Sequence, residues 1–334
     1  MKNLIFIICA VSFSCSTMTI EKRKERTINW LKNLESKPDH KILTGQFIGW
    51  GSDTYFEDID TIHRMSGQWL GHLGLDYHTM VPGHGPALKI EKDAPNKIII
   101  NYGVKICNMS MHFNNPFTDS SSWNNKADLS LLFQEGNLYI TKLNAELDSM
   151  ALGMKRLQEA GILVLYRPLH EMSGDWFWWC KTDTANFKKL WIHIYNYLTV
   201  EKQLKNIIWA YSPSTAGDAL LLYPGDSYVD VVCFDAYTPN LYPDVEKCYD
   251  QLCTLNKPIG LGEYGCLDGS DVYNKNNYHH DYMKFVNDLK THYPKICFFL
   301  TWRKGYSLKN HLNIDSMLND PVMINKNDLP DFLK

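Results

Sequence analysis

The sequence lacks the patterns by which several large classes of protein are recognised. No CxxC pair occurs among its nine cysteines, so a zinc or redox site finds little support. No GxGxxG follows the first apolar run, and a dinucleotide site is therefore not expected. The net charge is −3 and basic residues form no block in the folded region, which argues against nucleic acid as a partner. Repeats, linkers and low-complexity tracts are also missing, so we expect one domain.

The N-terminal apolar run is too short for a transmembrane helix. It covers residues 4–13, whereas a bilayer requires about 20 residues. Lys2 precedes it and Ser14-Cys15-Ser16 follows it, which is the pattern of an export leader. Cys15 resembles the lipidated cysteine of bacterial lipoproteins, with Ser12 where leucine is commonest in the motif SFSC. We expect a leader at 1–15 and an exported domain at 16–334, anchored by lipid in the periplasm or at the cell surface rather than freely secreted.

What the sequence does contain is a series of short apolar runs that alternate with helical patterns. Its 334 residues, 45% of them hydrophobic, suffice for one large core. Runs that are apolar throughout, rather than alternating, are typical of strands that are buried on both faces, as in a parallel sheet wrapped by helices. Eight such units predict an α/β fold, a (β/α)8 TIM barrel, with an open doubly wound sheet as the alternative. The runs are residues 41–47, 70–77, 103–112, 162–166, 206–211, 228–237, 258–265 and 295–302.

The cysteines do not look like a disulfide framework. Cys107, Cys233 and Cys297 lie inside strand-like apolar runs, where a buried free thiol is the commoner state. Three other cysteines lie close in sequence, and one disulfide bridge among them is possible: Cys248, Cys253 and Cys266.

Polar and aromatic residues gather at the ends of the predicted strands, which is where barrel enzymes carry their chemistry. Two glutamates, Glu171 after strand four and Glu263 on strand seven, would face each other across the barrel mouth. Paired carboxylates in this arrangement are what glycoside hydrolysis requires. The other strand-end residues are His112, Arg167, His170, Tyr211, Asp235, Tyr237, Trp302 and Arg303, and Trp176, Trp178 and Trp179 follow strand four.

Each of these residues also has a plain structural explanation. A strand-end glutamate is often a salt-bridge partner, and tryptophans are often core. His170-Glu171 begins like the zinc motif HExxH, but residue 174 is glycine, so no metal site is expected. Because all these residues fall at the strand ends of one predicted barrel, their combination favours a catalytic site.

The stretch RPLHEMSGDWFWW (167–179) resembles the signature of glycoside hydrolase family 26, whose clan carries an acid/base on strand four and a nucleophile on strand seven. Further resemblances follow in order along most of the chain: SMHFNNP (110–116), YPGDSYVDVVCFDAY (223–237), GLGEYG (260–265), and TW with Arg303. The resemblance implies a retaining β-glycanase, in most members a β-1,4-mannanase. It implies no cofactor and no metal. The segment KGYSLKNHLN (304–313) is shorter and less aromatic than the loop often found there.

Carried over position by position, the resemblance implies that Glu171 is the general acid/base and Glu263 the nucleophile. Tyr237 would donate a hydrogen bond to the nucleophile. The remaining implied roles are contacts with the sugar chain or with the carboxylates, by His112, Arg167, His170, Trp176, Asp235, Trp302 and Arg303.

Physical chemistry gives the aromatic cluster a purpose beside the acid. A glutamic acid that donates a proton near neutrality needs a raised pKa, and surroundings of low polarity penalise its charged form. We expect Trp176 to face the sugar and at least one of Trp178 and Trp179 to pack inward. The leading hypothesis is hydrolysis of β-1,4 bonds in mannan, glucomannan or galactomannan. The alternatives are another β-glycan, such as mixed-linkage glucan or xylan, and a non-catalytic sugar-binding lipoprotein.

Overall fold

A computed structural model describes residues 18–35, 40–51, 53–54, 56–81, 85–180, 182–267 and 279–334. The predicted leader and Cys15 lie outside these residues. Among the helices of the described ranges, none combines the length and apolar character that a bilayer crossing requires.

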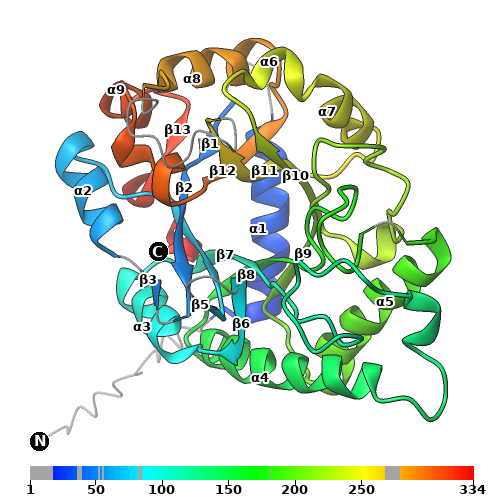
Figure 1. The fold of residues 1–334 in the computed structure, drawn as a ribbon. Helices are drawn as coiled ribbons and strands as arrows, with labels where there is room; N and C mark the ends of the chain where they lie inside the picture. Colours follow the sequence, from blue (N-terminus) through cyan, green and yellow to red (C-terminus); the bar gives the residue numbers. More distant parts are fainter. Residues whose placement is uncertain are drawn as a thin grey trace, which may run out of the picture.

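Eight parallel strands form a closed barrel (Figure 1). Each pairs with the next in chain order, and the last pairs back with the first through Thr301 and Gln46. The predicted barrel is therefore confirmed, and the open sheet is excluded. Every strand is almost entirely buried, as strands covered by helices must be. The strands are β2 (Gly45–Trp50), β4 (His72–Asp76), β7 (Ile106–Ser110), β8 (Leu163–Arg167), β9 (Ile207–Tyr211), β10 (Val231–Tyr237), β11 (Ile259–Gly265) and β12 (Ile296–Thr301).

Helices surround the barrel because each presents one apolar stripe to the strands. In α4, Leu143, Leu147, Met150, Met154 and Leu157 are buried at spacings of three and four. The helix ends before Gly161, whose φ of +73° is in the left-handed region. The surrounding helices are α2 (Glu57–Ser66), α3 (Asp93–Tyr102), α4 (Tyr139–Glu159), α5 (Thr184–Asn196), α6 (Leu241–Asp244), α7 (Glu246–Cys253), α8 (Tyr282–Thr291) and α9 (Ile314–Leu318).

The N-terminal helix α1 (Ile20–Leu34) crosses the end of the barrel where the strands begin (Figure 1). Arg23 Nη1 donates to Gly161 O just before β8 across 2.6 Å. Lys24 pairs with Asp230 at 2.7 Å, just before β10. Because α1 covers this end, a ligand reaches the barrel axis from the opposite end, where the strands finish.

Several short elements lie outside the eight-strand pattern. β1 (Ile42–Leu43) and β13 (Met323–Ile324) extend the sheet beside β12, and β3 (Asp53–Thr54) pairs antiparallel with β2. A hairpin of β5 (His78–Val81) and β6 (Gly85–Ile90) follows β4 and was not predicted from the sequence. The long loop between β7 and α4 holds one short 3-10 helix, Leu129–Leu131.

The seven cysteines of the described residues are all free. Cys107, Cys233 and Cys297 are buried thiols in β7, β10 and β12, as predicted. The bridge left open among Cys248, Cys253 and Cys266 does not form.

Candidate active site

A cavity of about 420 Å³ opens at the end of the barrel where the strands finish. Eight of the ten predicted site residues line it, and they come from five different strands or from the loops that follow them. The lining consists of Trp50, His112, Trp123, His170, Glu171, Trp176, Phe177, Tyr237, Glu263, Trp302, Arg303, Lys304 and Tyr306.

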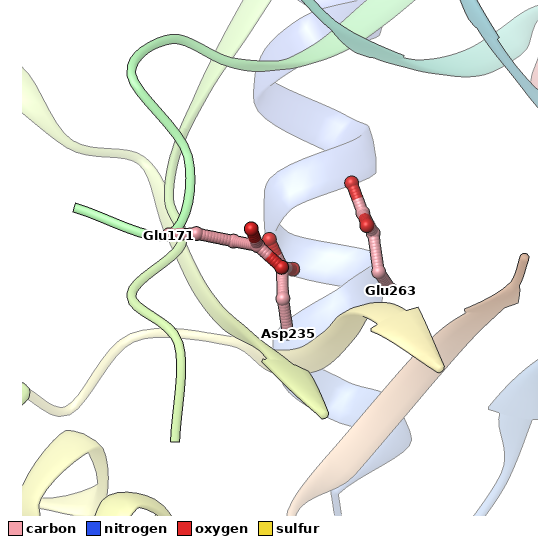
Figure 2. A group of neighbouring side chains, drawn as sticks. All are labelled: Glu171, Asp235 and Glu263. Carbon is pink, nitrogen blue, oxygen red and sulfur yellow. The ribbon is translucent and has the colours of Figure 1, made fainter. Parts of the chain in front are cut away.

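The two predicted catalytic glutamates converge on this cavity (Figure 2). Glu263 lies within β11, and Glu171 lies in the turn four residues beyond β8. An oxygen of each lies within 4.8 Å of the other and of an oxygen of Asp235. Retaining glycosidases hold their two carboxyl groups about 5–5.5 Å apart, whereas inverting enzymes need about 6.5–9.5 Å for a water molecule. The separation of the two oxygens here lies below the range of the inverting class.

One fully buried arginine holds two of the three carboxylates. Arg167, the last residue of β8, donates through Nη1 to both oxygens of Asp235 at 3.0 and 2.9 Å. Its Nη2 donates to Oε1 of Glu263 at 2.8 Å, and its Nε donates to Asn108. Of the two roles expected for Arg167 and Asp235, contact with the sugar chain and contact with the carboxylates, the structure shows the second. Both residues lie outside the cavity lining, where Asp235 holds Arg167 and Arg167 holds Glu263.

Gly262 makes this close packing of polar groups feasible. A Cβ atom at residue 262 would lie 2.5 Å from both Asp235 Oδ1 and Ser212 Oγ. The Ser212 hydroxyl in turn donates to Asp235 across 2.7 Å. Any larger residue at 262 would therefore push apart the groups that orient the nucleophile.

Glu263 receives one hydrogen bond on each carboxylate oxygen. Arg167 donates to Oε1, and the Tyr237 hydroxyl donates to Oε2 across 2.6 Å. Burial, together with the negative charges of Glu263 and Glu171, raises the pKa of Tyr237 well above its usual value. The phenol therefore stays protonated as a donor, and the orientation of the nucleophile is fixed at both oxygens.

Glu171 is the carboxyl group of the three that Arg167 does not hold. Burial raises its pKa well above the usual value, and the negative charges of Glu263 and Asp235 act in the same direction. A hydrogen bond from Trp176 and the charge of Arg167 oppose the shift without cancelling it. Glu171 thus keeps its proton at a pH where an ordinary glutamate has lost it, as a general acid must.

The backbone of Glu171 is held in an uncommon conformation. Its φ is +57°, in the left-handed region, and Leu169 has a φ of +52°. The Glu171 N–H donates to Ser212 O across 2.7 Å, which ties this turn to the end of β9. Strained backbone of this kind concentrates at functional sites, because the surrounding structure must hold it in place.

The three carboxylates also have the spacing of a cation site. Arg167 already contacts two of them and supplies a positive charge inside the cluster. The proton of Glu171 and the guanidinium of Arg167 together offset the like charges, so the arrangement is explained by acid–base chemistry alone.

The tryptophans after Glu171 have two different environments, one buried and one at the cavity, as predicted. Trp178 and Trp179 are buried, and their indole N–H groups donate to Phe113 O and His170 O. Trp176 is partly exposed, lines the cavity, and donates to Glu171 Oε2 across 2.6 Å. A Cβ at Gly174 would lie 2.5 Å from the Trp176 ring, so glycine there lets the indole fold back over the acid.

Aromatic residues from the first and last barrel strands, β2 and β12, form a second side of the cavity. Trp302, directly after β12, stacks on Phe47 of β2 with ring centres 3.8 Å apart. Trp50 packs edge-on against Trp302, and the Arg303 guanidinium lies 5.4 Å from the centre of the Trp50 ring. Trp50, Trp302 and Arg303 all line the cavity.

The two predicted histidines lie side by side. The rings of His112 and His170 are 4.7 Å apart, and His170 Nε2 lies 3.8 Å from Glu263 Oε1. Burial lowers the pKa of His170 well below its usual value, and the positive charge of Arg167 acts in the same direction. His170 is therefore neutral beside the nucleophile.

Sequence reasoning missed several residues of the site. Trp50 and Asp76 end strands β2 and β4, so the rule that found the other residues could have found these two. Trp123 lies in the irregular loop after β7, where no periodic pattern indicates which side chains turn toward the cavity. Lys304 and Tyr306 belong to the short segment after β12.

Comparison with known proteins agrees with this geometry. A mannan endo-1,4-beta-mannosidase of Bacillus subtilis (strain 168) is 31% identical over 331 residues, which covers 92% of this chain and 87% of the relative. The solved structure of the Bacillus subtilis mannanase BCman superposes with a TM-score of 0.83 at 30% identity, covering 95% of this chain and 98% of that one. The Bacillus subtilis mannanase man26 gives 0.82 at 29% identity, with coverage of 95% and 98%. Residues 17–328 match the profile of glycosyl hydrolase family 26, and the chain belongs to that family.

Proposed function

We propose that this protein is a β-mannanase that hydrolyses β-1,4 bonds of mannan, glucomannan or galactomannan with retention of configuration. The observation that carries the proposal is the pair Glu171 and Glu263, with carboxylate oxygens within 4.8 Å at the mouth of the barrel. Its relatives, whose names describe mannanases, support the choice of mannan as substrate.

The geometry supports a double displacement. Protonated Glu171 donates its proton to the glycosidic oxygen while Glu263 attacks the anomeric carbon and forms a covalent glycosyl-enzyme. The leaving chain departs with the proton. Glu171, now ionised, then removes a proton from a water molecule that attacks the same carbon, and Glu263 is released. The raised pKa of Glu171 suits the first step, and the donors on Glu263 keep that carboxylate oriented throughout.

Two measurements test this proposal together. Proton NMR of the first products of manno-oligosaccharide hydrolysis should show the β-anomer before mutarotation, and an initial α-anomer would contradict retention. Hydrolysis of unbranched mannan, galactomannan, glucomannan, xylan and mixed-linkage glucan should be fastest on the mannans. Faster turnover of xylan or mixed-linkage glucan would favour the alternative substrates. Binding of mannan without hydrolysis would favour the hypothesis of a non-catalytic sugar-binding lipoprotein.

We also propose that the protein is exported and anchored by a lipid on Cys15. The support is the sequence pattern alone, with Lys2, the apolar residues 4–13 and the SFSC motif that ends at Cys15. Mass spectrometry of the mature protein should find an acylated Cys15 at its N-terminus, and Cys15→Ala should leave the membrane fraction. A mature protein cleaved elsewhere and carrying no lipid would contradict the anchor and leave the enzymology untouched.

A further inference from the structure

Behind His112 lies a buried polar chain that the catalytic pair does not use. Asp76, at the end of β4, is fully buried. Its Oδ2 accepts from His112 Nδ1 across 2.6 Å and from the His112 backbone N–H across 3.1 Å. Because Asp76 occupies Nδ1, Nε2 is the ring nitrogen of His112 that remains for the cavity lined by this residue.

The chain continues away from the cavity through a second histidine. The backbone N–H of His78 donates to Asp76 Oδ1 across 2.8 Å, and His78 Nδ1 lies 3.5 Å from the same oxygen. On its other side, His78 Nε2 lies 3.6 Å from Glu146 Oε2 on α4. Glu146 also accepts hydrogen bonds from the backbone and side chain of Asn114, two residues beyond His112.

The charges along this chain compensate one another. Burial alone would keep His78 neutral, but Asp76 and Glu146 outweigh it and raise the pKa of His78 to about 9. Burial likewise disfavours an ionised Asp76, but the hydrogen bond from the His112 ring and the nearby His78 imidazole together hold its pKa well below the usual value. With an imidazolium at His78, the carboxylate of Asp76 already has a cationic partner, so a second positive charge at His112 is not required.

We infer that Asp76 is a positioning residue: it holds the proton of His112 on Nδ1, so that Nε2 accepts a hydrogen bond from a hydroxyl of the sugar bound next to Glu263. His78 and Glu146 keep Asp76 in place and ionised. The packing of the two histidines identifies this sugar as the one next to Glu263, because the His112 ring contacts His170, and His170 Nε2 lies 3.8 Å from Glu263 Oε1. The inference rests on the proposed function, since it assigns Asp76 a role in holding that substrate.

Two readouts separate this role from a purely structural one. Long-range proton–nitrogen NMR of the free enzyme at neutral pH should show His112 protonated on Nδ1 alone, and Asp76→Asn should move the proton to Nε2. The same variant should lower kcat/KM on an aryl β-mannobioside between about tenfold and a hundredfold, within the range expected when a buried polar group loses its hydrogen-bond partner. On the mannobioside that lacks the hydroxyl donating to His112 Nε2, wild type and Asp76→Asn should differ in kcat/KM by less than about twofold.

A second variant covers the case in which Asp76→Asn does not fold. Glu146→Gln, on a side chain that is 17% exposed, should shift the His112 nitrogen signals and lower kcat/KM in the same direction by a smaller factor. Asp148→Asn is its matched control, because Asp148 is on the same helix and contacts Lys202 instead. This control should leave both readouts unchanged, and thermal melts should accompany each variant.

The outcomes decide between the two roles. A His112 protonated on Nε2, or on both nitrogens, in the wild-type enzyme would overturn the inference. The inference would also be overturned if the variants changed the melting temperature but left kcat/KM unchanged, both on the full substrate and on the substrate that lacks the hydroxyl. If the wild-type enzyme hydrolyses no mannoside, the proposed function fails, and the NMR result still decides whether Asp76 positions His112.

Discussion

The indole N–H of Trp176 donates a hydrogen bond to Oε2 of Glu171 across 2.6 Å, although the same ring forms part of the cavity wall. The hydrogen bond favours the ionised form of Glu171 and so works against the burial that raises the pKa of this acid. Trp176 thus moderates how strongly the acid holds its proton, in addition to offering a flat surface to a sugar ring.

The first prediction follows from this contact. Trp176→Phe keeps an aromatic ring and removes the donor, so the pKa of Glu171 should rise further. Activity that needs protonated Glu171 is lost as pH rises through that pKa, and the alkaline limb of kcat/KM should therefore move to higher pH. Trp123→Phe is the control, because Trp123 lines the same cavity and packs on Phe177 at 4.9 Å. An unmoved limb in Trp176→Phe, or an equal shift in the control, would contradict the role.

The second prediction separates the two glutamates by leaving group. Glu263→Ala should abolish turnover of every substrate, because no covalent intermediate forms. Glu171→Ala should retain more activity on aryl glycosides with good leaving groups, which depart without protonation. Azide should partly restore that variant by attacking the glycosyl-enzyme. Equal loss in both variants on all leaving groups would contradict the assignment.

A third prediction concerns stability and pH. The folded protein holds the Glu171 proton more tightly than the unfolded chain does, so this residue lowers the free energy of unfolding as pH rises above about 4.3, the unfolded value. Each unit by which the pKa is raised corresponds to about 1.4 kcal/mol. Glu171→Gln mimics the neutral acid and should melt like wild type near pH 4 and above wild type at pH 7. Glu159→Gln, on the exposed surface of α4, controls for replacing a glutamate in general. A difference between Glu171→Gln and wild type that does not grow with pH would count against the raised pKa.

Arg167 supplies the fourth prediction, because two carboxylates depend on it. Arg167→Met should lower the free energy of unfolding by roughly 3–5 kcal/mol, since it leaves Asp235 and Glu263 buried without their cationic partner. Adding Asp235→Asn removes one of the uncompensated charges and should restore part of that loss, while activity stays low in both variants. Urea denaturation of the single and double variants measures the effect. A double variant less stable than Arg167→Met would show that charge compensation is not what Arg167 contributes.

Sequence periodicity predicted the barrel and most of the cavity, because both depend on where strands end. Apolar runs mark the strands, and parallel strands bring their ends to one mouth, so Glu171 and Glu263 could be placed together before any geometry was known. The sequence pattern does not show how deep each strand-end side chain lies along the barrel axis. Arg167 ends β8 and lies outside the cavity lining, so of its expected contacts with sugar or carboxylates it makes those with the carboxylates, while His170 and Glu171, a few residues further on, reach the cavity.

The polar chain from His112 to Glu146 shows a second limit of sequence reasoning. Its members come from β4, the hairpin strand β5, the end of β7 and the helix α4, so no spacing in the sequence connects them. Asp76 could have been singled out as a strand-end carboxylate, but its pairing with His112 depends on side-chain direction. Trp123 was equally hidden, because irregular loops carry no period from which orientation can be inferred.

The last prediction concerns the tryptophans after Glu171, whose two environments differ sharply. Trp179 is fully buried and bonded to His170 O, so Trp179→Ala should lower the free energy of unfolding by roughly 3–5 kcal/mol, as truncation of a core aromatic does. Trp176 is partly exposed at the cavity, and Trp176→Ala should keep a near wild-type melting temperature while kcat/KM on mannan falls about tenfold or more, for loss of a stacking partner. Trp302→Ala should resemble Trp176→Ala in its loss of activity. Thermal melts and mannan hydrolysis on the same preparations decide the matter. If Trp176→Ala unfolds the protein while its folded fraction keeps full activity, this ring is core and not a sugar platform.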